Sequence, residues 1–451
     1  MAITAEPERA LDTLWRPFTQ HALRQKPLVI VEGRGSTVVD EDGTEYLDAM
    51  AGLWCVNVGY GRERLVEAAA QQMRRLPYTP LSRPAPSALK LAEQMAEILP
   101  GDLNHLLLLN SGSEAVEAAL KVARQCMRQR HPRQNRHKVI ARYRGYHGWT
   151  LGALGATGQT VRKSRFEPLI PGFIHVRPPD TFHLFPGLSP SEAARQLADE
   201  LDQTIEFEGP DTVAAFIGEP IIGGGGVIVP PDEYWPLIRQ VCDRHGVLLI
   251  QDEVITGFGR TGKWFGCQTF GVVPDIMTMA KGISSGYLPL AATAVTAEVF
   301  DAFKGDPADN LQFNQISTYG GHPVACAVAL ENLAILQEER LPQRAAEVGA
   351  HLGDGLRALQ QRHPVVGEVR GKGLLWGLDL AKPGTRDPLP IAKVNAVIAA
   401  AQQRGVLVGR NSGTVPRYEC VVTISPPLVI TAEEVDRLVA VLDESLASAQ
   451  S

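Results

Sequence analysis

The segment LLLLNSGSEAVEAALKVARQ, residues 106 to 125, joins an apolar run, a short polar turn and a helical pattern. The four leucines predict a strand, and the turn is Ser111-Gly112-Ser113. After the turn, apolar residues recur at helical spacing: Ala115, Val116, Ala119, Leu120 and Ala123. A strand that leads directly into a helix is a building unit of α/β folds, so this segment predicts that class.

The same alternation of apolar runs and helical stretches extends from about residue 62 to 325. Five of these runs predict strands: LLLLN (106–110), KVIARY (138–143), TVAAFIGEP (212–220), VLLIQDE (247–253) and DIMTMAK (275–281). Strands separated by helices favour a largely parallel sheet that helices cover on both faces. The loop DTFHLFPGLSPSE (180–192) is expected on the surface because turn-forming residues dominate it.

The two ends of the chain have a different pattern. STVVDEDGTEYLDAMAG (36–52) predicts a hairpin around the turn Asp42-Gly43. Beyond about residue 325, a long helical pattern is followed by the strand-like segments GEVRGKGLLWGLDL (367–380) and VLVGR (406–410). A last helix is predicted after the capping box Thr431-x-x-Glu434. The end of the chain therefore predicts a smaller α+β domain.

Composition excludes several classes of function. Hydrophobic residues make up 44% of the 451 residues and charged residues 21%, and no apolar run approaches the roughly 18 residues of a membrane span. A net charge of −6 gives no general attraction to nucleic acid. The first residues lack the pattern of a signal peptide, so a cytoplasmic protein is expected. Six scattered cysteines without a C-x-x-C pair suggest neither a zinc site nor a disulfide framework, and no metal is expected.

Three motifs resemble known sites without their structural context. GFGRTG (257–262) matches a dinucleotide-binding turn, but no helical pattern follows it. The same residues almost form a phosphate-binding P-loop, except that Trp264 stands where Ser or Thr would hold magnesium. GISSG (282–286) fits the nucleophile elbow of serine hydrolases around Ser284, but Pro289 would disrupt the helix that must follow.

Lys281 is the stronger candidate for the reactive residue. It lies among Met277, Ala280 and Ile283, and a setting of low polarity depresses the pKa of a lysine and lets it condense with an aldehyde. A lone lysine at a strand end is usually solvated and inert, so a reactive Lys281 requires the other parts of a pyridoxal phosphate site nearby. Asp252, at the end of VLLIQ, suits the carboxylate that keeps the pyridine nitrogen protonated; the alternative is a turn-capping aspartate.

Two further parts of such a site are present. The predicted helix after Ser111 offers free N–H groups to a phosphate, although Ser111 and Glu114 also form an ordinary capping box. GYHGWT (145–150) supplies Tyr146 and His147 in a glycine-flanked loop that lets a ring approach a ligand; the alternative is plain packing. Four such parts, each at a predicted strand end, together favour a cofactor site.

These motifs resemble those of the class III aminotransferases, which are fold type I enzymes that use pyridoxal 5′-phosphate (PLP). The similar segments occur in the same order across most of residues 30 to 430: NSGSEA, GYHG, GEPI, QDEVITGFGRTG, AKGISSGYLPL and STYGGHP. The resemblance implies a homodimer with shared active sites and a ping-pong reaction of an amine donor and a keto acid acceptor. It also implies a large domain (55–325) around a mainly parallel seven-stranded sheet. Residues 1–54 and 326–451 would form the small domain.

The resemblance also assigns roles to individual residues. Lys281 would bind the cofactor covalently and shuttle the proton, and Asp252 would contact the pyridine nitrogen. The other implied cofactor contacts are Gly112, Ser113, Tyr146, His147, Glu219, Val254 and Thr318, of which Thr318 would reach the phosphate from the second subunit. Plain strand core is an equal alternative for Val254.

The segment AGLWCVNVGYGR (51–62) is similar to omega-aminotransferases that use pyruvate and act on omega-amino acids or primary amines. Trp54 and Tyr146 would line the substrate pocket, although a structural role for Trp54 is equally open. Arg410 matches the arginine that pairs with a substrate carboxylate, but the segment after it is longer than in the family and adds Arg417 as a competitor. An aminomutase, a racemase or a decarboxylase of the same fold is the alternative function.

Overall fold

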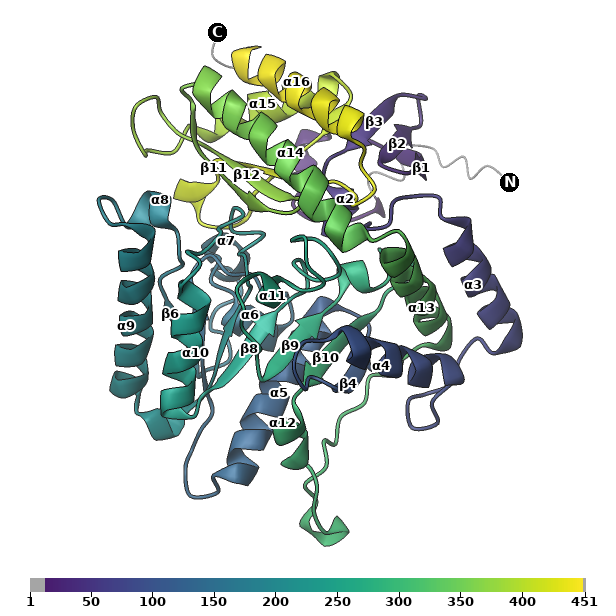
Figure 1. Ribbon diagram of the computed structural model, residues 1–451, viewed down its shortest axis with the longest axis vertical. Helices are drawn as coiled ribbons and strands as arrows, with labels where there is room; N and C mark the ends of the chain where they lie inside the picture. The colour runs from purple at the N-terminus through teal and green to yellow at the C-terminus, as the bar shows by residue number, and fades with distance from the viewer. Residues whose placement is uncertain (1–12, 449–451) are drawn as a thin grey trace.

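A computed structural model describes residues 13–448 of the chain, and its centre is a seven-stranded sheet (Figure 1). The strands lie in the order β4 (His105–Leu109), β10 (Ala291–Val295), β9 (Ile276–Met279), β8 (Leu248–Asp252), β7 (Val213–Gly218), β5 (Lys138–Arg142) and β6 (Phe173–Val176). β10 is antiparallel to both of its neighbours, whereas β9, β8, β7, β5 and β6 pair in parallel. The predicted α/β class with a mainly parallel seven-stranded sheet is confirmed.

Helices of different lengths pack against this sheet and against two smaller sheets. The longer ones are α3 (Glu63–Arg75), α4 (Pro86–Ile98), α5 (Gly112–Arg130), α9 (Pro190–Glu208), α10 (Tyr234–His245), α13 (Pro323–Glu338), α14 (Leu341–Arg362), α15 (Ile391–Gln403) and α16 (Ala432–Ser448). The short ones are α2 (Ala51–Trp54), α6 (Leu151–Ala156), α7 (Thr160–Lys163), α8 (Thr181–Leu184), α11 (Gly266–Thr269) and α12 (Ala297–Asp301). Single 3₁₀ turns are η1 (His21–Leu23), η2 (Pro210–Thr212), η3 (Lys281–Ile283), η4 (Pro307–Asp309) and η5 (Pro416–Tyr418).

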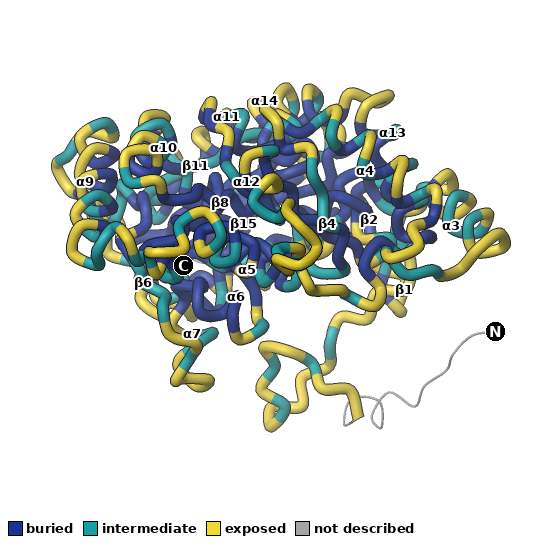
Figure 2. Tube along the Cα trace, turned by 90° about the horizontal axis from the view of Figure 1, so that it is seen from below, coloured by how far each residue is buried: buried dark blue, intermediate teal, exposed yellow. Residues whose placement is uncertain are grey.

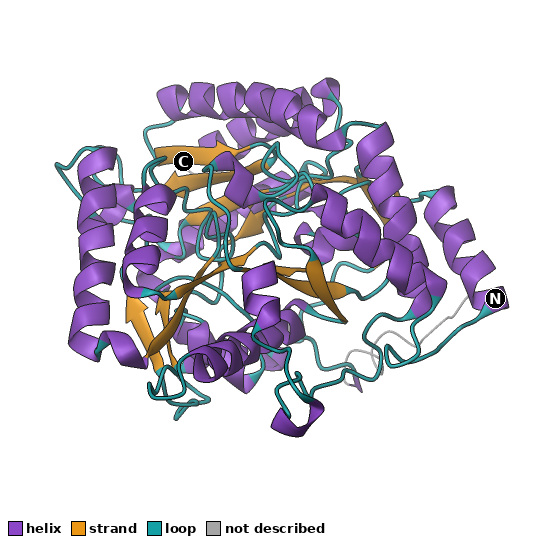
Figure 3. Ribbon diagram, turned by 60° about the horizontal axis from the view of Figure 1, so that its bottom comes forward, coloured by secondary structure: helices purple, strands orange, loops and turns teal. Residues whose placement is uncertain are grey.

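Helices cover both faces of the sheet. Successive residues of a strand point to opposite sides, and in β7 and β8 the residues on both sides are buried. Phe216 and Leu249 pack in one cluster with apolar residues of α9 and α10. Their neighbours in the chain, Ala215 and Ile250, pack in another cluster with residues of α5 and α6. Figure 3 shows the strands of this sheet lying between helices. The sheet is thus buried on both sides, and its edges remain for a ligand.

Each of the five apolar runs predicted as strands coincides with a strand to within a few residues, namely β4, β5, β7, β8 and β9. The strands β6 and β10 are not among the predicted strands. β10 has the sequence AATAV, whose small side chains give a weak apolar signal although the whole strand is buried. β6 is a four-residue edge strand in which only Val176 is buried. Both strands depend on contacts with their neighbours more than on their own sequence.

Two smaller sheets lie apart from the central one, and the first of them combines segments from both ends of the chain. The first contains β1 (Ile30–Arg34), β2 (Thr37–Asp40), β3 (Glu45–Asp48) and β13 (Val406–Leu407), with β13 parallel to β3. The second contains β11 (Val366–Lys372), β12 (Leu375–Leu380), β15 (Val421–Ile424) and β14 (Gly409–Arg410). The hairpin predicted around Asp42-Gly43 and the capping box of Thr431 and Glu434 are both present.

The pairing of β3 with β13 supports the division into a large domain (55–325) and a small domain from both ends of the chain (1–54 and 326–451), which we retain as a proposal. Residues 1–12 and 449–451 lie outside the described residues. The boundary at residue 325 falls inside α13, and α13 packs against α3 and α4. We therefore propose that the large domain extends to the turn at Glu339 and Arg340.

The expectation of a surface loop over residues 180–192 is wrong in part. The segment contains α8 and the start of α9, and Asp180 and Phe185 are buried. Figure 2 shows where buried and exposed residues lie along the chain; the segment before β1 is largely exposed. Among the described residues, no helix is long and apolar enough to cross a membrane.

Candidate active site

The strand ends of the central sheet meet at one cavity of about 160 Å³. Eight of the predicted cofactor contacts line it: Gly112, Ser113, Tyr146, His147, Glu219, Asp252, Val254 and Lys281. Each of them lies at or just after the carboxyl end of β4, β5, β7, β8 or β9. Parallel strands bring their carboxyl ends to one edge of the sheet, so these residues meet there. The structure therefore brings together residues as far apart in the chain as Gly112 and Lys281.

Asp252, the last residue of β8, is held by two hydrogen bonds. Its Oδ2 lies 2.8 Å from Nδ1 of His147, and its Oδ1 accepts the N–H of Val254 at 3.1 Å. Both Asp252 and His147 are buried, and Nε2 of His147 has no hydrogen-bond partner among the described residues. The carboxylate is thus oriented from one side by an imidazole, and this arrangement suits a contact with a cationic ring nitrogen.

Lys281 begins the turn directly after β9 and is partly buried. Burial lowers the pKa of its ammonium below the ordinary value, although Asp252 and Glu219 act in the opposite direction. Its Nζ lies 5.7 Å from the ring centre of Trp54. The backbone φ of Lys281 is +48°, a conformation that costs a residue with a Cβ about 1 to 3 kcal/mol and is found preferentially at functional sites.

Glu219 fixes the loop that carries Tyr146. Its Oε1 accepts the N–H of Tyr146 at 3.0 Å and its Oε2 accepts the N–H of Gly223 at 2.8 Å. Burial raises the pKa of this carboxyl, and the nearby Asp252 adds to the rise while His147 opposes it. Glu219 therefore positions the Tyr146 loop and lines the same cavity as Lys281.

The start of α5 offers free donors to an anion. Ser111 and Glu114 form the capping box, which confirms the alternative interpretation of this turn. The N–H groups of Gly112 and Ser113 nevertheless have no acceptor among the described residues, and the Oγ of Ser113 accepts the N–H of Trp149 at 3.1 Å. A Cβ on Gly112 would lie 3.1 Å and 3.2 Å from the Cγ atoms of Val254. Capping and anion binding are thus compatible at this helix end.

The motifs set aside in the sequence lack the required context in the structure as well. Turns follow GFGRTG, and the next helix is the four-residue α11. The Oγ of Ser284 donates to the carbonyl of Leu288 at 2.5 Å, and no helix follows GISSG before β10. Ser284 is buried and bound, as expected for a structural hydroxyl.

Four predicted residues do not line the cavity around Lys281: Trp54, Thr318, Arg410 and Arg417. Thr318 is exposed in a separate groove of about 620 Å³, and its carbonyl accepts the hydroxyl of Tyr78 at 2.8 Å. Arg410 forms an ion pair with Glu419, with Nη1 and Oε2 2.9 Å apart. Arg417 is exposed on η5 and lines a third groove.

Arg162, in α7, lies next to the cavity through its contact with Tyr146, and no motif of the sequence predicts it there. Its guanidinium carbon lies 4.7 Å from the ring centre of Tyr146, which lines the cavity with Lys281. Trp54 is close as well, since a Cβ on Gly224 would contact both Tyr146 and Trp54. Arg162 stands in the polar stretch QTVRKSR, where nothing local distinguishes it from a surface residue.

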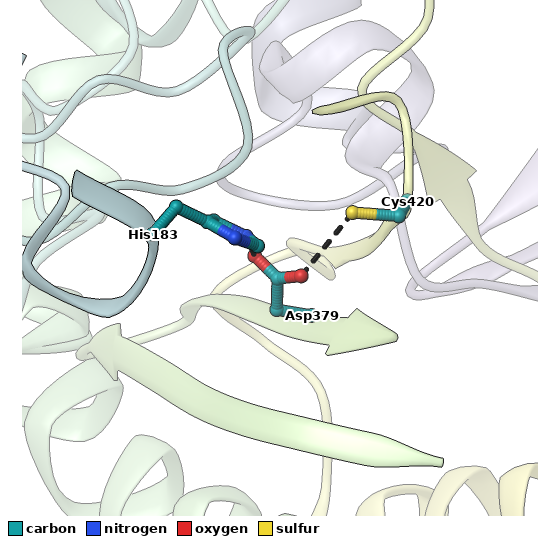
Figure 4. Close-up of side chains that lie close together, drawn as sticks. All are labelled: His183, Asp379 and Cys420. Carbon is teal, nitrogen blue, oxygen red and sulfur yellow. Dashed lines mark hydrogen bonds and ion pairs between the residues drawn. The ribbon is translucent and has the colours of Figure 1, made fainter. Parts of the chain in front are cut away.

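His183, Asp379 and Cys420 form a second cluster of side chains with metal-binding capacity (Figure 4). Oδ2 of Asp379 lies 3.0 Å from Nε2 of His183 and 2.9 Å from Nη2 of Arg370, and Oδ1 accepts the thiol of Cys420 at 3.2 Å. Burial raises the pKa of that thiol, so it stays protonated. Arg370 already compensates the carboxylate, and the cluster joins α8 to β12 as an ion-pair network.

Comparison with known proteins identifies relatives of the whole chain. The family model of the class III aminotransferases matches residues 18–446. An uncharacterized aminotransferase of Bacillus subtilis is 48% identical over 95% of this chain and 94% of its own. A taurine–pyruvate aminotransferase of Bilophila wadsworthia is 40% identical over 97% and 96%, respectively. The crystal structure of an (S)-enantioselective omega-transaminase from Thermomicrobium roseum is 42% identical, with a TM-score of 0.92 over 99% of this chain and 98% of that one.

Proposed function

Because the chain belongs to the class III aminotransferases, which use PLP, we propose that it transfers the amino group of an omega-amino acid or a primary amine to pyruvate in a ping-pong cycle. The observation that carries the proposal is the convergence of Lys281, Asp252 and the free N–H groups of Gly112 and Ser113 on one cavity. A lysine, a buried carboxylate and an anion site are the three contacts that this cofactor requires.

The residues present fit the cofactor. When bound, PLP supplies a cationic ring that stabilises negative charge on the substrate carbon. Asp252, held by His147, would keep the proton on the ring nitrogen, and the N–H groups of Gly112 and Ser113 would bind the phosphate. Lys281 would accept and return the substrate proton, because its lowered pKa makes the neutral amine more accessible near neutral pH.

The substrate pocket would be formed by Trp54 and Tyr146. Both side chains lie close to Gly224, and the ring of Trp54 lies beside Nζ of Lys281. Nε1 of Trp54 is buried without a hydrogen-bond partner among the described residues, which leaves it free to donate to a ligand. The taurine–pyruvate relative supports pyruvate as acceptor and an omega-amino acid as donor.

The enzyme would act as a homodimer in which Thr318 reaches the phosphate of the second subunit. Thr318 is exposed and separated from the cavity of its own chain. Large apolar side chains are exposed around it, including Ile316, Tyr319 and Tyr78. An active monomer in light scattering would contradict this assembly. Mixing Lys281→Ala with Thr318→Ala subunits should restore activity, because one site of the mixed dimer keeps both residues.

We keep the cytoplasm as the proposed compartment, and cell fractionation tests it.

The function itself is tested by a half-reaction scan. The purified enzyme with PLP is mixed with β-alanine, taurine, putrescine, 1-phenylethylamine or glutamate, and the visible absorbance of the bound cofactor is followed. Bleaching by an amine and recovery with pyruvate are expected. Recovery with 2-oxoglutarate alone would refute pyruvate as acceptor, and no bleaching by any donor would favour the mutase, racemase or decarboxylase alternatives.

A further inference from the structure

The arginine that resemblance assigns to the substrate carboxylate is already paired in this chain. Nη1 of Arg410 lies 2.9 Å from Oε2 of Glu419, and the two side chains are 17% and 10% exposed. The other oxygen of Glu419, Oε1, accepts the N–H of Gly413 at 2.9 Å. Glu419 is therefore held by its own loop, and the charge of Arg410 is compensated before a substrate arrives.

The loop 411–419 lies against α7. The N–H of Val161 donates to the carbonyl of Thr414 at 3.1 Å, and Nη2 of Arg162 donates to the carbonyl of Ser412 at 3.3 Å. Gly413 has φ +76°, and a Cβ there would lie 3.6 Å from the guanidinium carbon of Arg162. The segment that neutralises Arg410 thus also contacts Arg162.

Arg162 is held firmly without an ion-pair partner. Its guanidinium carbon lies 4.6 Å from the ring centre of Phe18 and 4.7 Å from that of Tyr146. Its Nε donates to Oε1 of Gln159 at 2.6 Å, and Gln159 is itself anchored on the carbonyl of Arg144 at 3.0 Å. Among the described residues, no carboxylate is in ion-pair contact with Arg162, and its Nη1 makes no hydrogen bond.

A partly buried cation that lies beside the active cavity, without a carboxylate in ion-pair contact among the described residues, is suited to an anion. Burial is the main cause that lowers the pKa of Arg162, which means that its charge loses hydration and gains from an anionic partner. Its planar fork is preorganised by two aromatic rings and by Gln159, so little side-chain entropy is lost when an acidic group binds.

We propose that Arg162, and not Arg410, binds the carboxylate or sulfonate of the omega-amino acid donor, as its specificity-determining residue. This inference rests on the proposed function. In this arrangement Tyr146 lies between the acidic group of the donor, bound at Arg162, and the carbon of the donor that reacts. The ion pair with Glu419 keeps Arg410 from competing for the acidic group.

The test compares donors with and without an acidic group in the half-reaction of wild type and Arg162→Met. For β-alanine, the concentration giving half-maximal bleaching rate should rise about tenfold to hundredfold, because hydrogen bonds to a charged group are lost. The response to 1-phenylethylamine should keep its concentration dependence, which also shows that the variant is folded. Arg162→Lys should restore part of the β-alanine response, since it keeps the charge but not the fork.

The matched control neutralises the other arginine together with its partner, as Arg410→Met/Glu419→Gln, because the amide oxygen can still accept the N–H of Gly413 and keep the loop that contacts Arg162. We expect this variant to bind β-alanine as wild type does, within experimental error. Equal loss in the control and in Arg162→Met, or loss in the control alone, overturns the assignment. An unchanged β-alanine response of Arg162→Met overturns it as well.

A second readout does not depend on turnover. Propionate, which has the carboxylate but no amine, should quench or shift the tryptophan fluorescence of wild type at concentrations that leave Arg162→Met unaffected. If no donor bleaches wild type, the proposed function fails; propionate binding that depends on Arg162 would then still support the anion site. Propionate binding that is equal in both proteins refutes the site.

Discussion

Gly112→Ala should weaken cofactor binding without unfolding the protein. The new Cβ would lie 3.1 Å and 3.2 Å from the two Cγ atoms of Val254 and 3.6 Å from Cβ of Ala280. The backbone of Gly112 is helical, so the cost is steric and not conformational. Val254 must move by a few tenths of an ångström, and overpacking of this kind costs about 1 to 3 kcal/mol.

This cost should fall on the form with bound PLP. Without cofactor, Val254 has the cavity to move into, and alanine in a helix is favoured over glycine by at most about 1 kcal/mol. With cofactor, the ring would block that movement. The apparent Kd for PLP, measured by fluorescence titration of the apoenzyme, should therefore rise about 5- to 150-fold.

A double-mutant cycle with Val254→Ala isolates the clash. In the Val254→Ala background, adding Gly112→Ala should change the Kd for PLP little, because the atoms that collide are gone. An unchanged Kd of Gly112→Ala alone would refute the placement of the ring beside Val254. A loss that persists in full in the Val254→Ala background would refute the steric explanation.

Asp252→Asn should retain bound PLP but lower the single-turnover bleaching rate on the order of a hundredfold. The amide can still accept the N–H of Val254, but it carries no charge to stabilise the protonated ring nitrogen. A rate equal to wild type would refute the role of this carboxylate. A pH-dependent loss of stability is expected from His175, whose pKa burial lowers from 6.5 to about 4. The unfolded chain binds more protons than the folded one between these values, so lowering the pH from 6.5 to 4 should remove up to about 3 kcal/mol of the free energy of unfolding. His175→Asn should lack this component in denaturant titrations across that range, and equal pH profiles of the two proteins would contradict it.

The sequence predicted those parts of the site that sit directly at strand ends. Asp252 ends a run of apolar residues and Lys281 follows another, so the topology alone brings them to one edge of the sheet. The turn before α5 was recognisable because its capping box and its helical pattern are local. The proposed contact of Thr318 with the phosphate involves a second chain. In a single chain Thr318 is exposed in a separate groove, so this contact stays a proposal.

The remaining features depend on pairings between distant side chains. The short segment around α8 carries turn-forming residues, yet Asp180 is buried because Arg144 forms an ion pair with it. Arg410 pairs with Glu419, which no spacing rule predicts, and Arg162 reaches the site through its contact with Tyr146. Such side-chain partners determine whether an arginine is neutralised by a carboxylate and whether a substrate can reach it. Hydrophobic periodicity predicts only the type of backbone element and which of its faces is buried.

The role of Lys281 is tested by locating the residue that binds the cofactor covalently. The enzyme with PLP is reduced with borohydride, digested and analysed by mass spectrometry, with Lys281→Ala treated in parallel. We expect a phosphopyridoxyl group on the peptide that contains Lys281, and loss of both adduct and turnover in Lys281→Ala. An adduct on another lysine of the wild type, or full turnover of Lys281→Ala, would contradict it.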